Sequence, residues 1–137
     1  MRLIVLDTNV VVSAGIKPIG FPAQILRAVV QEANVQIVVS PSITAEYRQV
    51  CRYSKFAQYG FPPQWLEFLI ESALRFPDSA PWRHPLPDPD DQCFLSLARD
   101  TGAWLITGYL KHYPVGSRAG VTVHTPAEYV AILDENS

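Results

Sequence analysis

The chain has 137 residues, of which 48% are hydrophobic and 18% are charged, and its formal net charge is −2. This length and composition predict a single domain over residues 1–137 that buries its own core. The weak negative charge excludes a uniformly basic nucleic-acid-binding coat, although a local basic face could still contact phosphate. Neither a signal peptide nor an apolar run of about 18 residues is evident, so we expect a cytoplasmic protein with no membrane partner.

Strand-like runs alternate with helical patterns along the chain. Strands are predicted at Arg2–Leu6, Val35–Val39, 103–106 and 121–123. Helices are predicted at 22–33, 43–53, 64–75, 90–101 and 126–133. Ser42 is expected to be the N-cap of the second helix, and the proline-dense stretch 77–89 is expected to be a loop. The alternation predicts an α/β protein with a parallel sheet of about four to five strands, covered by helices on both faces.

Neither the cysteines nor the histidines form a metal-binding pattern. Cys51 and Cys93 are far apart and lack CxxC spacing, which indicates reduced, structural thiols. His84, His112 and His124 form no HExxH-type pair, so the sequence gives little support for a zinc site.

Asp7 ends the first apolar run and opens the polar tripeptide Asp7-Thr8-Asn9. In open parallel α/β sheets, ligands bind outside the carboxyl ends of the strands. Asp7 is therefore a candidate site residue. The alternative is an N-cap role for this turn.

Glu46 lies on the helix predicted at 43–53. With successive residues about 100° apart, Glu46 falls in the middle of an apolar stripe formed by Ile43, Val50 and Tyr53. A carboxylate on a core-facing stripe requires a cation or a metal to offset its desolvation. The alternative is that Glu46 lies at the edge of the stripe and stabilises the helix dipole.

A second acidic cluster, Asp88-Pro89-Asp90-Asp91, begins the helix predicted at 90–101. Asp91 falls on the apolar face with Phe94 and Ala98, whereas Asp90 is less central. Asp88 has the position of an N-cap, and capping and dipole effects could explain all three acids. Capping does not explain the inward direction of Asp91.

Three inward carboxylates from separate elements, Asp7, Glu46 and Asp91, would repel one another without a cation between them. Hard oxygen ligands of this kind are typical of Mg²⁺ or Mn²⁺ sites. A divalent cation bound to a phosphodiester can activate water for hydrolysis.

Four motifs occur in order along nearly the whole chain: Leu6-Asp7-Thr8-Asn9-Val10, Ser40-Pro41 followed by Glu46, Asp88-Pro89-Asp90-Asp91 leading into Phe94-Leu95-Ser96-Leu97-Ala98, and Leu105-Ile106-Thr107-Gly108. Together they resemble the PIN domain, and most closely the VapC-like ribonuclease toxins of bacterial toxin–antitoxin pairs. The resemblance implies a three-layer α/β/α, Rossmann-like fold and an acidic site that uses Mg²⁺ or Mn²⁺ to cleave RNA. It also implies a homodimer and inhibition by a small antitoxin.

By position, the resemblance assigns Asp7, Glu46 and Asp91 as catalytic metal ligands, with Asp88 and Asp90 as possible further ligands. It places Asn9 and Thr107 in the lining of the site.

The chain departs from the family pattern at Tyr109, where many PIN domains have another acid, so the number of metals is left open. Lys111 and His112 could contact phosphate there, or His112 could assist proton transfer. The alternative for both is an exposed polar loop.

The leading hypothesis is a metal-dependent endoribonuclease of toxin type, in which a metal-activated water attacks phosphorus. The alternative is a catalytically degenerate PIN-like module that binds RNA or a protein without cutting. A structure-specific DNA nuclease is a third hypothesis, since the PIN fold resembles that of flap nucleases.

Overall fold

A computed structural model describes residues 1–32 and 34–135. Its centre is a five-stranded sheet in the order β3-β2-β1-β4-β5, and every pair of neighbouring strands is parallel. The strands are β1 (Arg2–Leu6), β2 (Val35–Val39), β3 (Leu74–Arg75), β4 (Trp104–Ile106) and β5 (Val123–His124).

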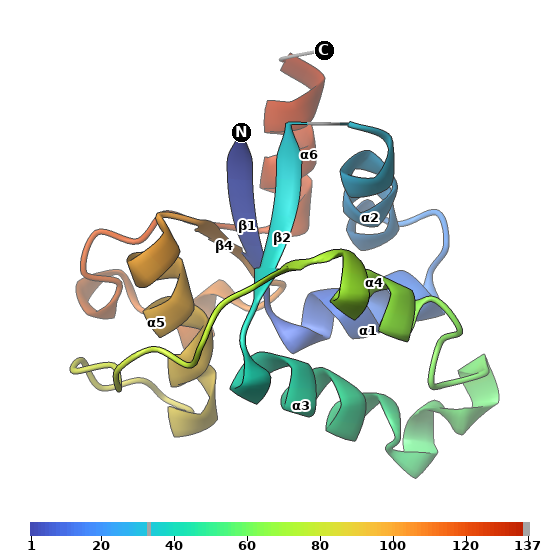
Figure 1. Cartoon of the computed structure of the whole chain (residues 1–137), viewed down its shortest axis with the longest axis horizontal. Helices are drawn as coiled ribbons and strands as arrows, with labels where there is room; N and C mark the ends of the chain where they lie inside the picture. The colour runs from blue at the N-terminus through green and yellow to red at the C-terminus, as the bar shows by residue number, and fades with distance from the viewer. Residues whose placement is uncertain (33, 136–137) are drawn as a thin grey trace.

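Helices cover both faces of this sheet, and Figure 1 shows α5 on one side of the strands and α2 on the other. The helices are α1 (Thr8–Ile16), α2 (Phe21–Gln31), α3 (Pro41–Cys51), α4 (Leu66–Ser72), α5 (Gln92–Thr101) and α6 (Pro126–Glu135). The predicted three-layer α/β/α fold with a parallel sheet is confirmed. Within residues 1–32 and 34–135, no helix has the length and apolar character needed to cross a membrane.

Strand β1 lies at the centre of the sheet. Ile4 pairs with Ile37 of β2 on one side and with Trp104 of β4 on the other. Ile4, Val5 and Leu6 are fully buried, as expected for a parallel strand covered on both faces. The carboxyl ends of β1 and β4 lie side by side because Leu6 is in register with Ile106. This register brings the residues after both strands to one edge of the sheet.

Helix α1 follows β1 directly and was not predicted from the sequence. Its run Val10-Val11-Val12 is β-branched, and such residues have weaker intrinsic helix preference. All three valines are buried in the core, so tertiary packing outweighs local preference here.

Several predicted boundaries are wrong at helix ends. The helix predicted at 64–75 ends at Ser72, and Leu74–Arg75 instead forms the edge strand β3 beside Val38 and Val39. The helix predicted at 90–101 begins at Gln92 and is preceded by a 3₁₀ turn, Pro89–Asp91.

Three more predictions need correction or restriction. Ser40, not Ser42, is the N-cap residue of α3, and Pro41 occupies the first turn. Ser42 instead donates its hydroxyl to Asp78 Oδ2 at 2.8 Å. The last strand begins at Val123 rather than at position 121. The predicted end, at Ala33, of the helix expected over 22–33 lies outside the described residues. Cys51 and Cys93 are both free thiols, as predicted.

Candidate functional site

Asp7 occupies the N-cap position of α1, but its carboxylate makes no capping hydrogen bond. Its Oδ2 atom accepts hydrogen bonds from the hydroxyls of Thr107 and Tyr113, both at 2.8 Å. Only 4% of Asp7 is exposed. The capping alternative therefore does not describe this side chain, which points to the residues after β4. The edge formed by β1 and β4 thus contains a buried carboxylate held by two hydroxyl groups.

Glu46 lies on α3 next to the same edge. Thr8 donates its hydroxyl to Glu46 Oε2 at 2.6 Å, which ties α3 to the start of α1. Burial raises the pKa of Glu46, the carboxylates of Asp7, Asp90 and Asp88 raise it further, and the Thr8 hydrogen bond opposes the shift. Both burial and the neighbouring acids therefore disfavour the charged form of Glu46.

The predicted position of Glu46 in the middle of the apolar stripe is wrong. The buried face of α3 consists of Ile43, Thr44, Tyr47 and Cys51. Glu46 borders this face and is half-buried, while Tyr53 lies beyond the helix and is 44% exposed. The prediction from the 100° helical spacing put the centre of the apolar stripe on the wrong side of α3, because it counted Tyr53 as a core residue instead of Tyr47.

Asp91 points inward, as predicted, and is only 7% exposed. Burial raises its pKa to about 7, and the negative charges of Asp7, Asp88, Glu46 and Asp90 add to the shift. Its buried Oδ2 accepts no hydrogen bond from any residue in the described ranges. The site therefore has excess negative charge at this oxygen.

His112 is the basic side chain beside Asp91. Its Nδ1 atom lies 3.3 Å from Asp91 Oδ2, so the histidine is within ion-pair range when protonated. Lys111, next to it, is exposed. The two residues thus differ: His112 faces the acids, and Lys111 faces solvent at the rim.

Asp88 and Asp90 are both exposed at the entrance to the site. Asp88 Oδ1 accepts a hydrogen bond from the Asp90 amide at 2.9 Å, which is the capping role expected for Asp88. The two acids raise the pKa of Asp91, so they add negative charge to the site without being buried in it.

Asn9 and Thr107 hold the loop after β4 against α1. The Gly108 amide donates to Asn9 Oδ1 at 2.8 Å, and the Tyr109 amide donates to Thr107 Oγ1 at 3.1 Å. A Cβ atom at Gly108 would lie 2.9 Å from Asn9 Oδ1, so glycine permits this close approach. Thr107 therefore contacts Asp7 directly, and Asn9 lies beside Thr107.

Three further residues of the site were not identified from the sequence. Tyr113 donates to Asp7, Thr8 donates to Glu46, and the buried Tyr47 donates its hydroxyl to the Leu6 carbonyl. Thr8 could have been found from its place between two candidate residues. Tyr113 gave no local signal, because its role depends on a loop that folds back towards β1.

The donor set fits a hard divalent cation in its chemistry. Asp7, Glu46 and Asp91 offer carboxylate oxygens, and the Oδ2 atom of Asp91 is buried, accepts no hydrogen bond from the described residues and has only the His112 ring nitrogen beside it, at 3.3 Å. No group of three or more His, Cys, Asp or Glu side chains in the described part of the chain has a ready-made metal-binding arrangement. Hydroxyl groups hold Asp7 and Glu46 instead.

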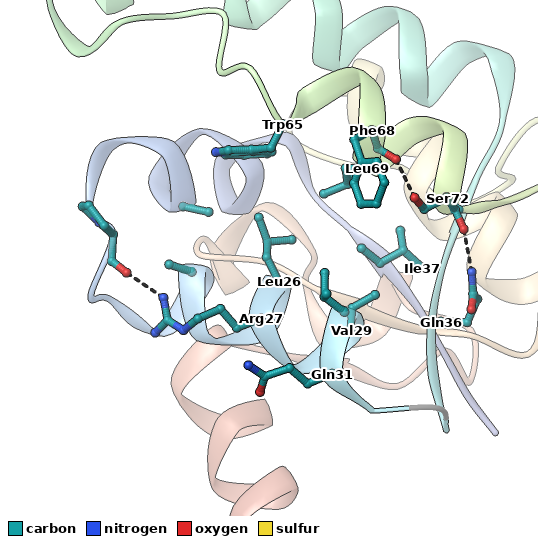
Figure 2. Close-up of a pocket in the computed structure, with 15 residues that line it drawn as sticks. Leu26, Arg27, Val29, Gln31, Gln36, Ile37, Trp65, Phe68, Leu69 and Ser72 are labelled. Atoms are coloured by element: carbon teal, nitrogen blue, oxygen red, sulfur yellow. Dashed lines mark hydrogen bonds between the residues drawn. The ribbon is translucent and has the colours of Figure 1, made fainter.

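A separate cavity of about 370 Å³ lies away from these acids, between α2, α4 and β2. Figure 2 shows Leu26, Val29 and Ile37 on one side of it and Trp65 and Leu69 on the other. Its lining is largely apolar and includes no carboxylate among the residues described. The cavity is therefore distinct from the acidic site.

Fold and site together define an α/β protein with a cluster of acids at the carboxyl edge of a parallel sheet. Residues 3–109 match the family model of the PIN domain. The chain belongs to the PIN domain family.

Known relatives agree with this placement. An uncharacterized protein of Methanocaldococcus jannaschii is 34% identical over 110 residues, which cover 77% of this chain and 69% of that protein. The fold is similar to a chain of VapBC2 from Rickettsia felis, solved bound to a DNA fragment from its promoter, with a TM-score of 0.65 and 17% identity over 90% of this chain and 98% of that one. It is also similar to a chain of FitAcB from Neisseria gonorrhoeae, with a TM-score of 0.57 and 18% identity over the same shares.

Proposed function

We propose that the chain is a metal-dependent endoribonuclease and the toxin component of a toxin–antitoxin pair. The observation that carries this proposal is the gathering of Asp7, Glu46 and Asp91 at one edge of the sheet, where burial, together with the negative charges of the neighbouring acids, raises the pKa of Asp91 to about 7. Such repulsion is offset when a cation shares the carboxylates. The family and the fold neighbours support the same class.

Asp7, Glu46 and Asp91 would hold Mg²⁺ or Mn²⁺, with Asp88 and Asp90 close enough to add negative charge. A bound divalent cation would neutralise the phosphate and lower the pKa of a water molecule for attack on phosphorus. Thr107 and Tyr113 orient the Asp7 carboxylate, and Thr8 orients that of Glu46. Lys111 and His112, at the rim, would contact the RNA phosphates.

The proposal extends to partners. The protein would act as a cytoplasmic homodimer of single-domain chains, inhibited by a small antitoxin protein. The apolar cavity beside α2 and α4, with Phe68 64% exposed at its rim, supports a protein partner because apolar surface of this kind commonly marks binding sites.

Cleavage of a labelled single-stranded RNA in Mn²⁺ and in EDTA tests the activity. We expect Asp7→Asn to lower the rate by about 100-fold or more, because it removes a ligand charge while keeping the side-chain shape. Asp100→Asn is the matched control, since Asp100 is exposed and paired with Arg99 at 2.8 Å. Unchanged cleavage by Asp7→Asn would refute the assignment.

The alternative is a PIN-like module that binds RNA or protein without cutting. Two observations favour it: residue 109 is a tyrosine where the resemblance to PIN domains implies an acid, and the carboxylates in the described residues are not preassembled for a metal. RNA binding without cleavage in any divalent cation would select this alternative. Flap DNA in the same assay distinguishes a DNA nuclease.

A further inference from the structure

The loop after β4 places an exposed aromatic ring beside the acidic site. Tyr109 is 51% exposed, and its ring lies against the His112 ring with 5.3 Å between centroids and 31° between planes. His112 in turn lies 3.3 Å from Asp91 Oδ2. In this tilted pair of rings, His112 therefore lies beside the acids, while Tyr109 is open to solvent.

Hydrogen bonds hold the backbone of Tyr109 next to the acidic site. Its amide donates to Thr107 Oγ1 at 3.1 Å, and the preceding Gly108 amide donates to Asn9 at 2.8 Å. Thr107 also donates to Asp7, so the same hydroxyl connects the backbone of Tyr109 to a candidate metal ligand. These hydrogen bonds connect the backbone that carries the Tyr109 ring to the acidic site.

Covering the exposed Tyr109 ring with a stacked nucleobase would remove apolar surface from water, which is favourable. Lys111, exposed two residues later, supplies a positive charge for a phosphate of the same strand. We propose that Tyr109 is a base-stacking platform that selects single-stranded RNA by binding an unstacked base next to the cleaved phosphodiester. This inference rests on the proposed ribonuclease function.

The substrate class follows from the geometry of stacking. In a duplex, both faces of each base are covered by its neighbours, and only single strands, loops and ends can present a free face. Tyr109 thus gives the site a contact that tolerates any base but requires an unpaired one. It replaces an acid of the family pattern with a substrate contact.

Binding of a short single-stranded RNA containing 2-aminopurine, measured in EDTA, tests this role separately from cleavage. We expect wild-type protein to quench the probe and Tyr109→Ala to weaken binding roughly 5–150-fold with loss of quenching. Tyr109→Phe keeps the aromatic ring and should retain both RNA binding and quenching of the probe. Tyr59→Ala removes a ring of similar exposure, 47%, beyond the end of α3, and should change neither. Binding of a duplex RNA should not respond to Tyr109→Ala.

The outcomes separate this inference from the ribonuclease proposal. If Tyr109→Ala binds and quenches as wild type does while cleavage remains sensitive to Asp7→Asn, the platform is wrong and the nuclease stands. If Tyr109→Ala loses binding but wild-type protein never cleaves, the platform stands and the nuclease fails. If wild-type protein neither binds nor cleaves RNA, both are overturned.

Discussion

The hydroxyl group of Tyr113 donates a hydrogen bond of 2.8 Å to the carboxylate of Asp7, joining residues that are 106 positions apart in the chain. Both side chains are buried. The contact fixes the direction of the Asp7 carboxylate, and Thr107 supplies the second donor to the same oxygen. Orientation of Asp7 therefore depends on a loop that the sequence alone did not connect with it.

Tyr113→Phe should destabilise the protein and slow RNA cleavage, because it leaves Asp7 with one hydroxyl donor. Loss of a hydrogen bond to a charged group predicts a decrease of about 1–3 kcal/mol in the free energy of unfolding, measured by urea denaturation. The matched control is Tyr129→Phe. The buried Tyr129 hydroxyl has no hydrogen-bond partner among the described residues, so its removal should cost nothing. Equal losses for the two variants would contradict a specific role for Tyr113.

Asp91 should make the metal-free protein less stable as pH rises. Its folded pKa of about 7 lies above the unfolded value of about 3.9, so between these values the folded chain holds a proton that the unfolded chain has released. The stabilising contribution of protonated Asp91 is full below about pH 4 and is lost as pH rises through 7. The free energy of unfolding should fall by roughly 1–4 kcal/mol over this range.

Denaturation of wild type and Asp91→Asn in EDTA from pH 4 to pH 8 measures this effect as a difference between the two proteins. The asparagine variant should lack the decline and be the more stable protein at pH 8. Asp100→Asn is the control, because its pKa is lowered by Arg99 and its contribution changes only at acidic pH. If the free energy of unfolding falls with pH by the same amount in wild type and in Asp91→Asn, Asp91 is not the source of the decline.

A bound divalent cation should offset the destabilisation that the charged Asp91 carboxylate causes at high pH. Mn²⁺ is expected to raise the Tm of wild-type protein at pH 8 and to raise it much less at pH 5, where protons compete for Asp91. Thermal scans with and without millimolar Mn²⁺ measure the shift. Asp91→Asn should show a smaller shift at pH 8. The same shift in wild type and in this variant would argue against Asp91 as a ligand.

Asp78 caps helix α3 from a distant part of the chain. Its carboxylate accepts hydrogen bonds from the Ser42 amide at 2.9 Å and the Ser42 hydroxyl at 2.8 Å, which lower its pKa. Asp78→Ala should lower the free energy of unfolding by about 0.5–2 kcal/mol at pH 7.

The stabilisation of the folded protein by Asp78 should be lost at acidic pH. Its folded pKa is depressed, so its contribution is present above the unfolded pKa and is lost as pH falls through the folded pKa. Ser42→Ala keeps the amide and should cost less than Asp78→Ala. A loss from Asp78→Ala that is the same at pH 2 and pH 7 would rule out the charged cap.

Gly108→Ala should disturb the loop after β4, since its Cβ atom would lie 2.9 Å from Asn9 Oδ1. The Asn9 side chain would have to turn away and lose its hydrogen bond from the Gly108 amide, which predicts a loss of about 0.5–1.5 kcal/mol in the free energy of unfolding and slower cleavage. Gly116→Ala is the control, because a Cβ atom there meets nothing within 4 Å. Denaturation and cleavage assays on both variants measure the effect; similar values for the two would contradict close packing at Gly108.

The sequence predicted most of the sheet because its inner strands are short, β-branched runs that end in polar residues. Residues 2–6 and 35–39 form β1 and β2 with the predicted bounds. It missed α1, where three consecutive valines favour a strand locally but pack into the core as a helix. It also missed β3, since Leu74 and Arg75 continue a helical pattern and become a strand only beside β2.

Candidate acids were easier to find than their partners. Asp7 and Asp91 are buried at one edge, as strand position and helix periodicity predicted. Glu46 is nearby, but at the border of its helix face rather than its centre. The hydroxyl donors Tyr113 and Thr8 act across the fold, and periodicity within one element carries no information on such contacts.

The central place of β1 has a consequence for protein synthesis. Strand β1 is made before the other four strands of this sheet and becomes its middle strand, and its partner β4 is translated about a hundred residues later. Asp7 finds its hydroxyl partners only when Thr107 and Tyr113 have left the ribosome. A nascent or truncated chain that stops before Thr107 thus lacks both partners, and the acidic site is completed only after the residues that follow β4 have been made.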